Sequence, residues 1–121
     1  MRRTVLAVDD SRTMRDMLRL ALTEAGYEVA EAVDGEEGLA ALGRLRPDAV
    51  IVDINMPRLD GFGFIERVRA DPLHRGLPIL VLTTEGTGAD KARACAAGAT
   101  GWIVKPFEPA KLAAALARVL A

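Results

Sequence analysis

The sequence has little cysteine, no long apolar run and no excess of charge of either sign. Its one cysteine, Cys95, excludes an internal disulfide, suits a reducing compartment and lies in an alanine-rich stretch that predicts a small buried side chain. From Met1 a short apolar run leads directly to Asp9 and Asp10, so we expect neither a signal peptide nor a membrane span. These features predict a cytoplasmic protein.

The balance of charge limits the partners that the chain can have. Acidic and basic residues are interleaved and the formal net charge is −1, so there is no basic stripe of the kind that binds a phosphate backbone. We therefore expect no nucleic acid partner. Of the 16 basic residues only Lys91, Lys105 and Lys111 are lysines, so a lysine at a functional position stands out against arginine.

The chain has the size of one globular domain, and we expect residues 1–121 to form it. Short apolar runs alternate with segments of helical period, which is typical of α/β proteins with a parallel sheet. The expected strands are 5–8, 27–32, 48–54, 79–83 and 102–104; helices begin near Arg12, Asp34 and Gly61 and cover 89–97 and 109–120. Strands that are apolar without alternation need helices on both faces, so we predict a three-layer α/β/α sandwich.

Apolar residues at spacings of three and four predict which helix faces point to the sheet. In the first two helices these residues are Met14, Met17, Leu18, Ala21, Leu22 and Ala25, then Leu39, Leu42 and Leu45. Asp10 or Ser11 could cap the first helix, and Asp34 is the expected cap of the second. We expect His74, in a polar segment, on the solvated surface.

Polar side chains end or directly follow four of the five expected strands. They are Asp9 and Asp10, then Asp53, then Thr83 and Thr84, and finally Lys105. In an open parallel sheet the ligand crevice lies beyond the carboxyl ends of the strands, so these side chains should meet there. Each residue has an ordinary alternative as a helix cap, a turn residue or a solvated lysine, but their joint occurrence favours a site.

Three carboxylates at one sheet edge predict a cation. At an effective dielectric of about 20 they would repel one another by several kcal/mol unless a proton or a cation intervenes. Mg²⁺ suits this edge best, because it takes oxygen ligands and uses only one or two carboxylates. Lys105 adds a point charge suited to a phosphoryl oxygen or to Asp53.

Four stretches resemble the receiver domain of two-component response regulators: VDDS at 8–11, DINMPRLDG at 53–61, LTT at 82–84 and KPF at 105–107. The resemblance covers the whole chain and implies the strand order 2-1-3-4-5. It implies that Asp53 accepts a phosphoryl group from a histidine kinase, and that Thr83 and Lys105 contact phosphoryl oxygens. The implied Mg²⁺ ligands are Asp10, Asp53, the backbone carbonyl of Asn55 and, through water, Asp9.

The resemblance also implies a conformational switch and residues that set the rate of dephosphorylation. The Lys105-Pro106 peptide is usually cis in this family, and movement of Thr83 opens space for an aromatic residue that is more often Tyr or Phe than the Trp102 found here. A half-buried tryptophan that never moves is the alternative. Asn55 and Glu85, each two residues past Asp53 and Thr83, should flank the path of water to the aspartyl phosphate, unless they are plain loop residues. We expect a short-lived phosphate.

Because the sequence ends with the helix at 109–120, we expect phosphorylation to act through a partner protein. The stretches NMP, LTTE and GWIVKPF resemble stand-alone chemotaxis regulators. This implies a flagellar motor switch protein as target, bound at the face formed by 89–97, 102–104 and 109–120.

Three other functions stay open from the sequence. One is a stand-alone receiver in a phosphorelay or cell-cycle circuit, and another is a binding module that does not depend on phosphorylation. The third is a small Mg²⁺-dependent phosphohydrolase of haloacid dehalogenase type, although such enzymes generally carry a second aspartate where Asn55 stands. As a receiver, the chain is not an enzyme, since it catalyses only its own phosphorylation and dephosphorylation.

Overall fold

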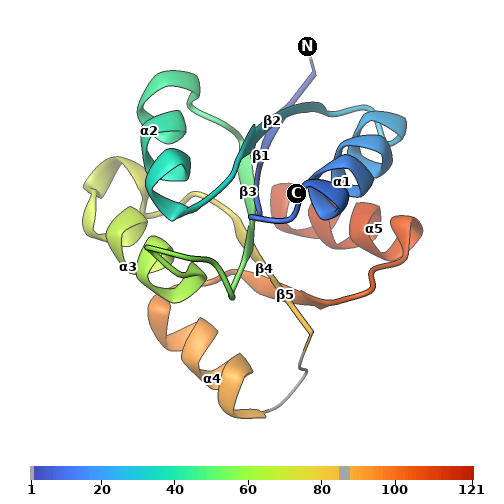
Figure 1. The fold of residues 1–121 in the computed structure, drawn as a ribbon. Helices are drawn as coiled ribbons and strands as arrows, with labels where there is room; N and C mark the ends of the chain where they lie inside the picture. Colours follow the sequence, from blue (N-terminus) through green and yellow to red (C-terminus); the bar gives the residue numbers. More distant parts are fainter. Residues whose placement is uncertain (1, 85–87) are drawn as a thin grey trace.

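The computed structural model describes residues 2–84 and 88–121, and this part of the chain forms one parallel sheet (Figure 1). The strands are β1 (Thr4–Val8), β2 (Glu28–Ala32), β3 (Ala49–Asp53), β4 (Ile79–Thr83) and β5 (Gly101–Val104). Their order is β2-β1-β3-β4-β5, and every neighbouring pair is parallel. The predicted sheet and its strand order are confirmed.

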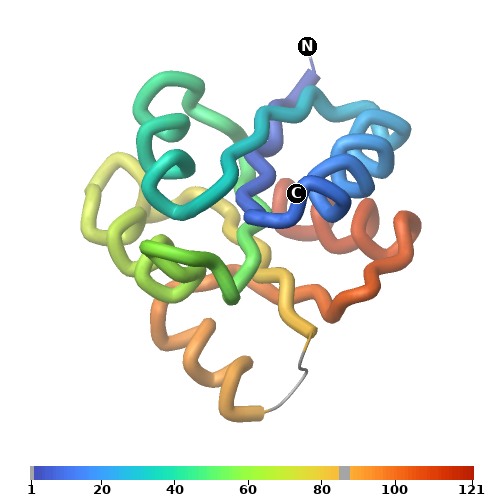
Figure 2. Tube along the Cα trace, in the orientation of Figure 1, coloured from blue at the N-terminus to red at the C-terminus, as the bar shows by residue number. Residues whose placement is uncertain are grey.

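Helices cover both faces of the sheet, as Figure 1 and the Cα trace of Figure 2 show. On one face lie α1 (Arg12–Glu24) and α5 (Pro109–Leu120), and on the other α2 (Gly35–Leu45), α3 (Gly61–Ala70) and α4 (Gly88–Ala97). A short 3-10 helix, Pro72–His74, follows α3. The three-layer sandwich is therefore confirmed. Within residues 2–84 and 88–121, no helix combines the length and the apolar character needed to cross a membrane.

The core has two halves, one on each face of the sheet. Leu6 and Val8 of β1 belong to the half that contains Phe64 of α3, whereas Val5 and Ala7 belong to the half that contains Leu18 of α1. Successive side chains of a strand point to opposite faces, so a strand covered on both sides must be apolar throughout. This explains why the central strands show no alternation in the sequence.

The observed element ends follow local hydrogen bonding. Ser11, not Asp10, caps α1, since its side chain accepts a hydrogen bond from the Met14 backbone N at 3.2 Å. Asp34 caps α2 as predicted, accepting from the Glu37 backbone N at 2.8 Å. The strand and helix bounds differ from prediction by at most one residue at either end. Tyr27 falls outside β2 because its backbone N donates to a carbonyl of α1.

Some predicted core residues are exposed. Met17 and Leu45 are each 43% exposed, Ala25 is exposed at the end of α1, and Cys95 is exposed on α4. The prediction that Cys95 fills the core is wrong because Ala94 takes the buried position of α4. Helical spacing finds an apolar arc, but the width of the arc that is covered depends on the neighbouring elements.

His74, which was expected on the solvated surface, is only partly exposed. Its side chain is 20% exposed, and its Nδ1 lies 3.5 Å from a carboxylate oxygen of Asp71. Both residues precede β4, and His74 lies near Asp48 and Pro78 at the amino edge of the sheet, opposite the edge where the strand-end aspartates lie. His74 is therefore no part of the site at the strand ends.

Candidate functional site

The predicted polar residues meet at the carboxyl edge of the sheet. The register pairs Val8 with Val52, Asp53 with Leu82, and Thr83 with Val104. Asp9 and Lys105, which follow β1 and β5, therefore lie at the same edge as the last residues of β3 and β4. The parallel topology alone produces this convergence, because every strand runs toward that edge.

Asp9, Asp10 and Asp53 form an acidic cluster. One carboxylate oxygen from each residue lies within 4.8 Å of the other two. Asp9 is fully buried and Asp53 is 4% exposed, whereas Asp10 is exposed. Burial and the neighbouring Asp9 raise the pKa of Asp53 above its ordinary value, although Lys105 acts in the opposite direction. The cluster thus brings together charges that favour either a proton or a cation.

Lys105 places its amino group beside this cluster. Its Nζ lies 3.1 Å from Oδ1 of Asp53 and 3.3 Å from Oδ2 of Asp9, and its side chain is only 13% exposed. The peptide bond between Lys105 and Pro106 is cis, and Pro106 itself is exposed. Of the two partners that the sequence suggested for Lys105, a phosphoryl oxygen or Asp53, the structure shows Asp53, together with Asp9.

The donor set of the cluster fits Mg²⁺. All three side chains offer carboxylate oxygens, which a hard divalent ion prefers, and the close approach of Asp9 to Asp53 is a repulsion that such an ion removes. Asn55 follows in the same loop, is exposed, and donates from its backbone N to Oδ1 of Asp53 at 3.4 Å. The acidic triad therefore has the donor set and the geometry typical of a magnesium site.

Thr83 and Trp102 occupy neighbouring strands but different environments. Thr83, at the end of β4, is 3% exposed, and Trp102 on β5 is 38% exposed. The ammonium of Lys91 on α4 lies 4.8 Å from the centroid of the Trp102 ring, a cation–π distance. The indole thus points outward, covered on one face by Lys91. Glu85, named above with Asn55, lies outside the described residues.

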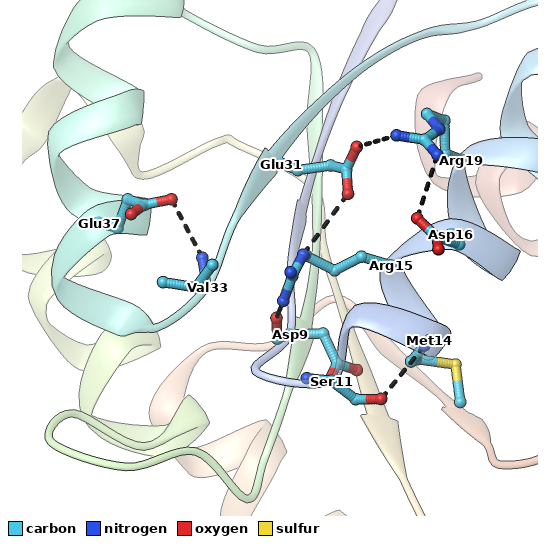
Figure 3. Close-up of polar contacts among 9 residues, drawn as sticks. All are labelled: Asp9, Ser11, Met14, Arg15, Asp16, Arg19, Glu31, Val33 and Glu37. Carbon is cyan, nitrogen blue, oxygen red and sulfur yellow. Dashed lines mark hydrogen bonds and ion pairs between the residues drawn. The ribbon is translucent and has the colours of Figure 1, made fainter.

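Arg15 is a neighbour of the site that the sequence did not reveal. Its Nη1 donates to the backbone carbonyl of Asp9 at 2.7 Å, and its Nε lies 3.5 Å from Glu31 of β2 (Figure 3). In the sequence Arg15 belongs to the polar side of a helix. The only signal was its place soon after Asp9, which becomes meaningful once Ser11 is known to begin the helix.

Comparison with known proteins gives consistent results. The model of the response regulator receiver domain matches residues 5–117. The chain is 42% identical over 116 residues to a Guillardia theta protein named "Probable transcriptional regulator ycf27". The matched region covers 96% of this chain and 44% of that protein. The chain spans about half the length of the first curated relatives it matches.

Two solved structures have nearly the same fold. The Vibrio cholerae chemotaxis protein CheY4 is 47% identical with a TM-score of 0.94, covering 98% of this chain and 99% of its own. The receiver domain of the sensor histidine kinase PA1611 from Pseudomonas aeruginosa is 29% identical with a TM-score of 0.92, covering 99% and 98%. That second structure has a magnesium ion coordinated in its active site cleft.

Proposed function

The chain belongs to the response regulator receiver domain family, and on this premise we propose that Asp53 is its phosphoryl acceptor and that the phosphorylated form binds a partner protein. Receiver domains take their phosphoryl group from a histidine kinase and catalyse only their own modification. This membership excludes the phosphohydrolase alternative. We also propose that residues 1–121 work as one receiver unit in the cytoplasm.

The position of Asp53 is the observation that carries this proposal. It is the last residue of β3, the central strand, and its carboxylate lies beside that of Asp9, with Lys105 in contact with both. The raised pKa of Asp53 marks a carboxylate whose ionised form is unfavourable in this environment and would be stabilised by a cation or a bound group. Asp9 is more deeply enclosed, and its Oδ1 already accepts from the Ser11 backbone N at 2.9 Å. Asp53 is therefore the carboxylate best placed to react.

The proposed reaction is an in-line transfer. A carboxylate oxygen of Asp53 attacks the phosphorus of a phosphohistidine, the phosphorus–nitrogen bond breaks, and the imidazole leaves with the electron pair. The product is an acyl phosphate on Asp53. Lys105 then contacts a phosphoryl oxygen of the product, and this contact replaces part of its ion pair with the Asp53 carboxylate.

We propose that Asp10 and Asp53 hold Mg²⁺ directly, Asp9 through water, and Asn55 by its backbone carbonyl. When bound, the ion offsets negative charge on the transferring group. The side chains do the remaining work: they orient the phosphoryl oxygens and keep Asp53 in place. Asn55 already lies beside the acceptor through its backbone contact with Oδ1 of Asp53.

Thr83 and Trp102 are the proposed switch. The hydroxyl of Thr83 would donate to a phosphoryl oxygen, and the small shift this needs would open space next to β5. Trp102 is the proposed responder, and its outward position with Lys91 over the ring is the inactive arrangement. We also propose that Asn55 and Glu85 guide water to the phosphate. Asn55→Arg or Glu85→Tyr should therefore slow its loss, as measured by the decay of phosphoprotein.

For the target we propose a flagellar motor switch protein in chemotaxis. Supporting this is the 47% identity to Vibrio cholerae CheY4 over nearly all of both chains. The proposed contact surface is the α4-β5-α5 face, where Trp102 and Val104 are exposed beside Lys91 and Lys111. A second candidate is control of transcription within a two-component system, supported by the identity to the transcriptional regulator ycf27. We propose direct contact with neither nucleic acid nor membrane.

Incubation with acetyl phosphate and Mg²⁺ tests the acceptor. We expect a single phosphate per chain, stable in acid and labile in alkali, located on Asp53 by mass spectrometry and absent from Asp53→Asn. Turnover of many phosphoesters, or phosphate on another residue, would refute the proposal.

A pull-down tests the target. The beryllofluoride-treated protein should retain a motor switch protein that untreated protein and Asp53→Asn do not. Retention of a transcription component instead would support the second candidate.

A further inference from the structure

We propose that Arg15 is a positioning residue for the magnesium site, because it holds the peptide that joins Asp9 to Asp10. The inference rests on the proposed function, since it assigns a new residue to the same site. It concerns a side chain outside the acidic cluster, on α1, that contacts the backbone of one ligand and none of the carboxylates of the triad.

Four contacts fix the position of Asp9. Its backbone N donates to the carbonyl of Ala32 at 3.1 Å, and its backbone carbonyl accepts from Arg15 at 2.7 Å. Its Oδ1 accepts from the Ser11 backbone N at 2.9 Å, and its Oδ2 lies 3.3 Å from Lys105. Three of the four contacts come from backbone or from the site itself. Apart from Lys105, which belongs to the site, Arg15 is the one side chain among these four contacts, so a substitution at Arg15 removes a support of Asp9 without removing a residue of the site.

The carbonyl that Arg15 contacts belongs to the peptide between the two aspartates. A peptide is planar, so fixing the direction of this carbonyl also fixes the plane from which the Asp10 side chain departs. Asp10 is exposed, and its carboxylate has greater need of such support than that of the buried Asp9. A hydrogen bond from a guanidinium is about twice as strong as one between neutral groups.

Arg15 is itself held in place by Glu31, which Figure 3 shows together with its second partner, Arg19. Its side chain is 14% exposed and lies 3.5 Å from Glu31 on the edge strand β2. Glu31 also accepts from Arg19 at 2.9 Å, and Arg19 contacts Asp16 at 3.0 Å. Glu31 thus fixes the guanidinium at one end while the Asp9 carbonyl fixes it at the other.

Positioning and simple electrostatics predict opposite results when Arg15 is removed. A positive charge near the cluster repels a divalent cation, so loss of the charge alone would tighten Mg²⁺ binding. Loss of the hydrogen bond would loosen the ligand pair and weaken Mg²⁺ binding. The sign of the change therefore identifies the role of Arg15.

The experiment measures Mg²⁺ affinity by titration calorimetry on the full chain. We expect Arg15→Met to bind Mg²⁺ about five-fold more weakly, the equivalent of one ordinary hydrogen bond. The Mg²⁺ concentration for half-maximal phosphorylation by acetyl phosphate should rise by the same factor, while the rate at saturating Mg²⁺ stays unchanged. Arg19→Met is the matched control. Arg19 contacts Glu31, as Arg15 does, but its other partner is Asp16 and not the Asp9 carbonyl. This variant should bind Mg²⁺ as tightly as the wild type does.

Glu31→Gln provides a second route to the same answer. This variant keeps Arg15 but weakens the contact by which Glu31 holds it. Mg²⁺ binding should therefore weaken when Glu31→Gln is made alone, and should not weaken further when it is added to Arg15→Met. This variant carries the test if Arg15→Met does not fold. Equal or tighter Mg²⁺ binding by Arg15→Met, or an equal loss in Arg19→Met, would overturn the inference. Failure of the wild type to bind Mg²⁺ would instead refute the proposed function.

Discussion

Replacing Lys105 with methionine tests the electrostatic basis of the site. The ammonium lies 3.1 Å from Asp53 and 3.3 Å from Asp9, and each pair contributes about 5 kcal/mol of attraction at an effective dielectric of about 20. Methionine keeps the length of the side chain but not the charge. The variant leaves two buried carboxylates whose mutual repulsion, at the 4.8 Å limit of their separation, is at least about 3 kcal/mol.

Removing a buried lysine also removes the cost of taking its charge out of water. The net loss should therefore be smaller than the sum of the attractions, about 3 kcal/mol, in the range found when one partner of a buried ion pair is deleted. With a typical urea dependence of about 1.5 kcal/mol per molar, the midpoint of unfolding should fall by about 2 M. The assay is urea unfolding followed by circular dichroism, first in EDTA.

Magnesium should restore most of the lost stability, because a divalent ion takes over the role of the missing ammonium. The variant should therefore gain more free energy of unfolding from saturating Mg²⁺ than the wild type does. Lys111→Met is the matched control: Lys111 is 77% exposed, lies 3.6 Å from Glu108, and should change stability by less than about 0.5 kcal/mol. A Lys105→Met protein as stable as the wild type in EDTA, or one that Mg²⁺ does not rescue, would refute the reasoning.

Three further predictions address the acceptor, its strand end and the switch. The pKa of Asp53 is raised above 3.8 in the folded protein, so its ionised form destabilises the fold at neutral pH. Asp53→Asn should therefore be more stable than the wild type in EDTA at pH 7. Urea unfolding at a series of pH values should show this difference in stability shrinking as the pH falls through the folded pKa. A gap independent of pH would contradict this. Gly61→Ala should lower both stability, by more than about 2 kcal/mol, and the phosphorylation rate, because its Cβ would lie 2.5 Å from the Asp53 carbonyl oxygen. Gly43→Ala, with open space around it, should be neutral or stabilising by up to about 1 kcal/mol. Lys91→Ala should increase quenching of Trp102 fluorescence by acrylamide, since one face of the ring loses its cover; unchanged quenching would show that the contact does not persist in solution.

Much of the site could be predicted from the sequence because a parallel sheet has a simple rule. Asp9, Asp53, Thr83 and Lys105 were each recognised as the residues that end or follow an apolar run, and parallel strands bring such residues to one edge whatever their distance along the chain. The resemblance added the strand order, which the apolar pattern alone leaves open. The oxygen ligands of a hard cation followed from residue type alone.

Other features depended on how the elements pack. Helical spacing placed Met17 inward, and residue type in an alanine-rich stretch placed Cys95 inward. Both are exposed, because only the neighbouring layers decide how wide a stripe of each helix is covered. The support of Asp9 by Arg15 could not be predicted, since it requires the Arg15 side chain of α1 to reach both the Asp9 carbonyl and Glu31 of the edge strand β2.

The sequence by itself therefore determined the α/β/α layers, the carboxylates at the strand ends and the demand of those carboxylates for a cation. These are consequences of residue type, period and order, which act locally or through the common direction of the strands. Only the tertiary structure decided that Lys105 contacts two acids, that Trp102 lies outward under Lys91, and that Arg15 holds the Asp9 carbonyl. Such contacts are set by distances of a few ångströms between separate elements, and neither composition nor periodicity specifies distances of that kind.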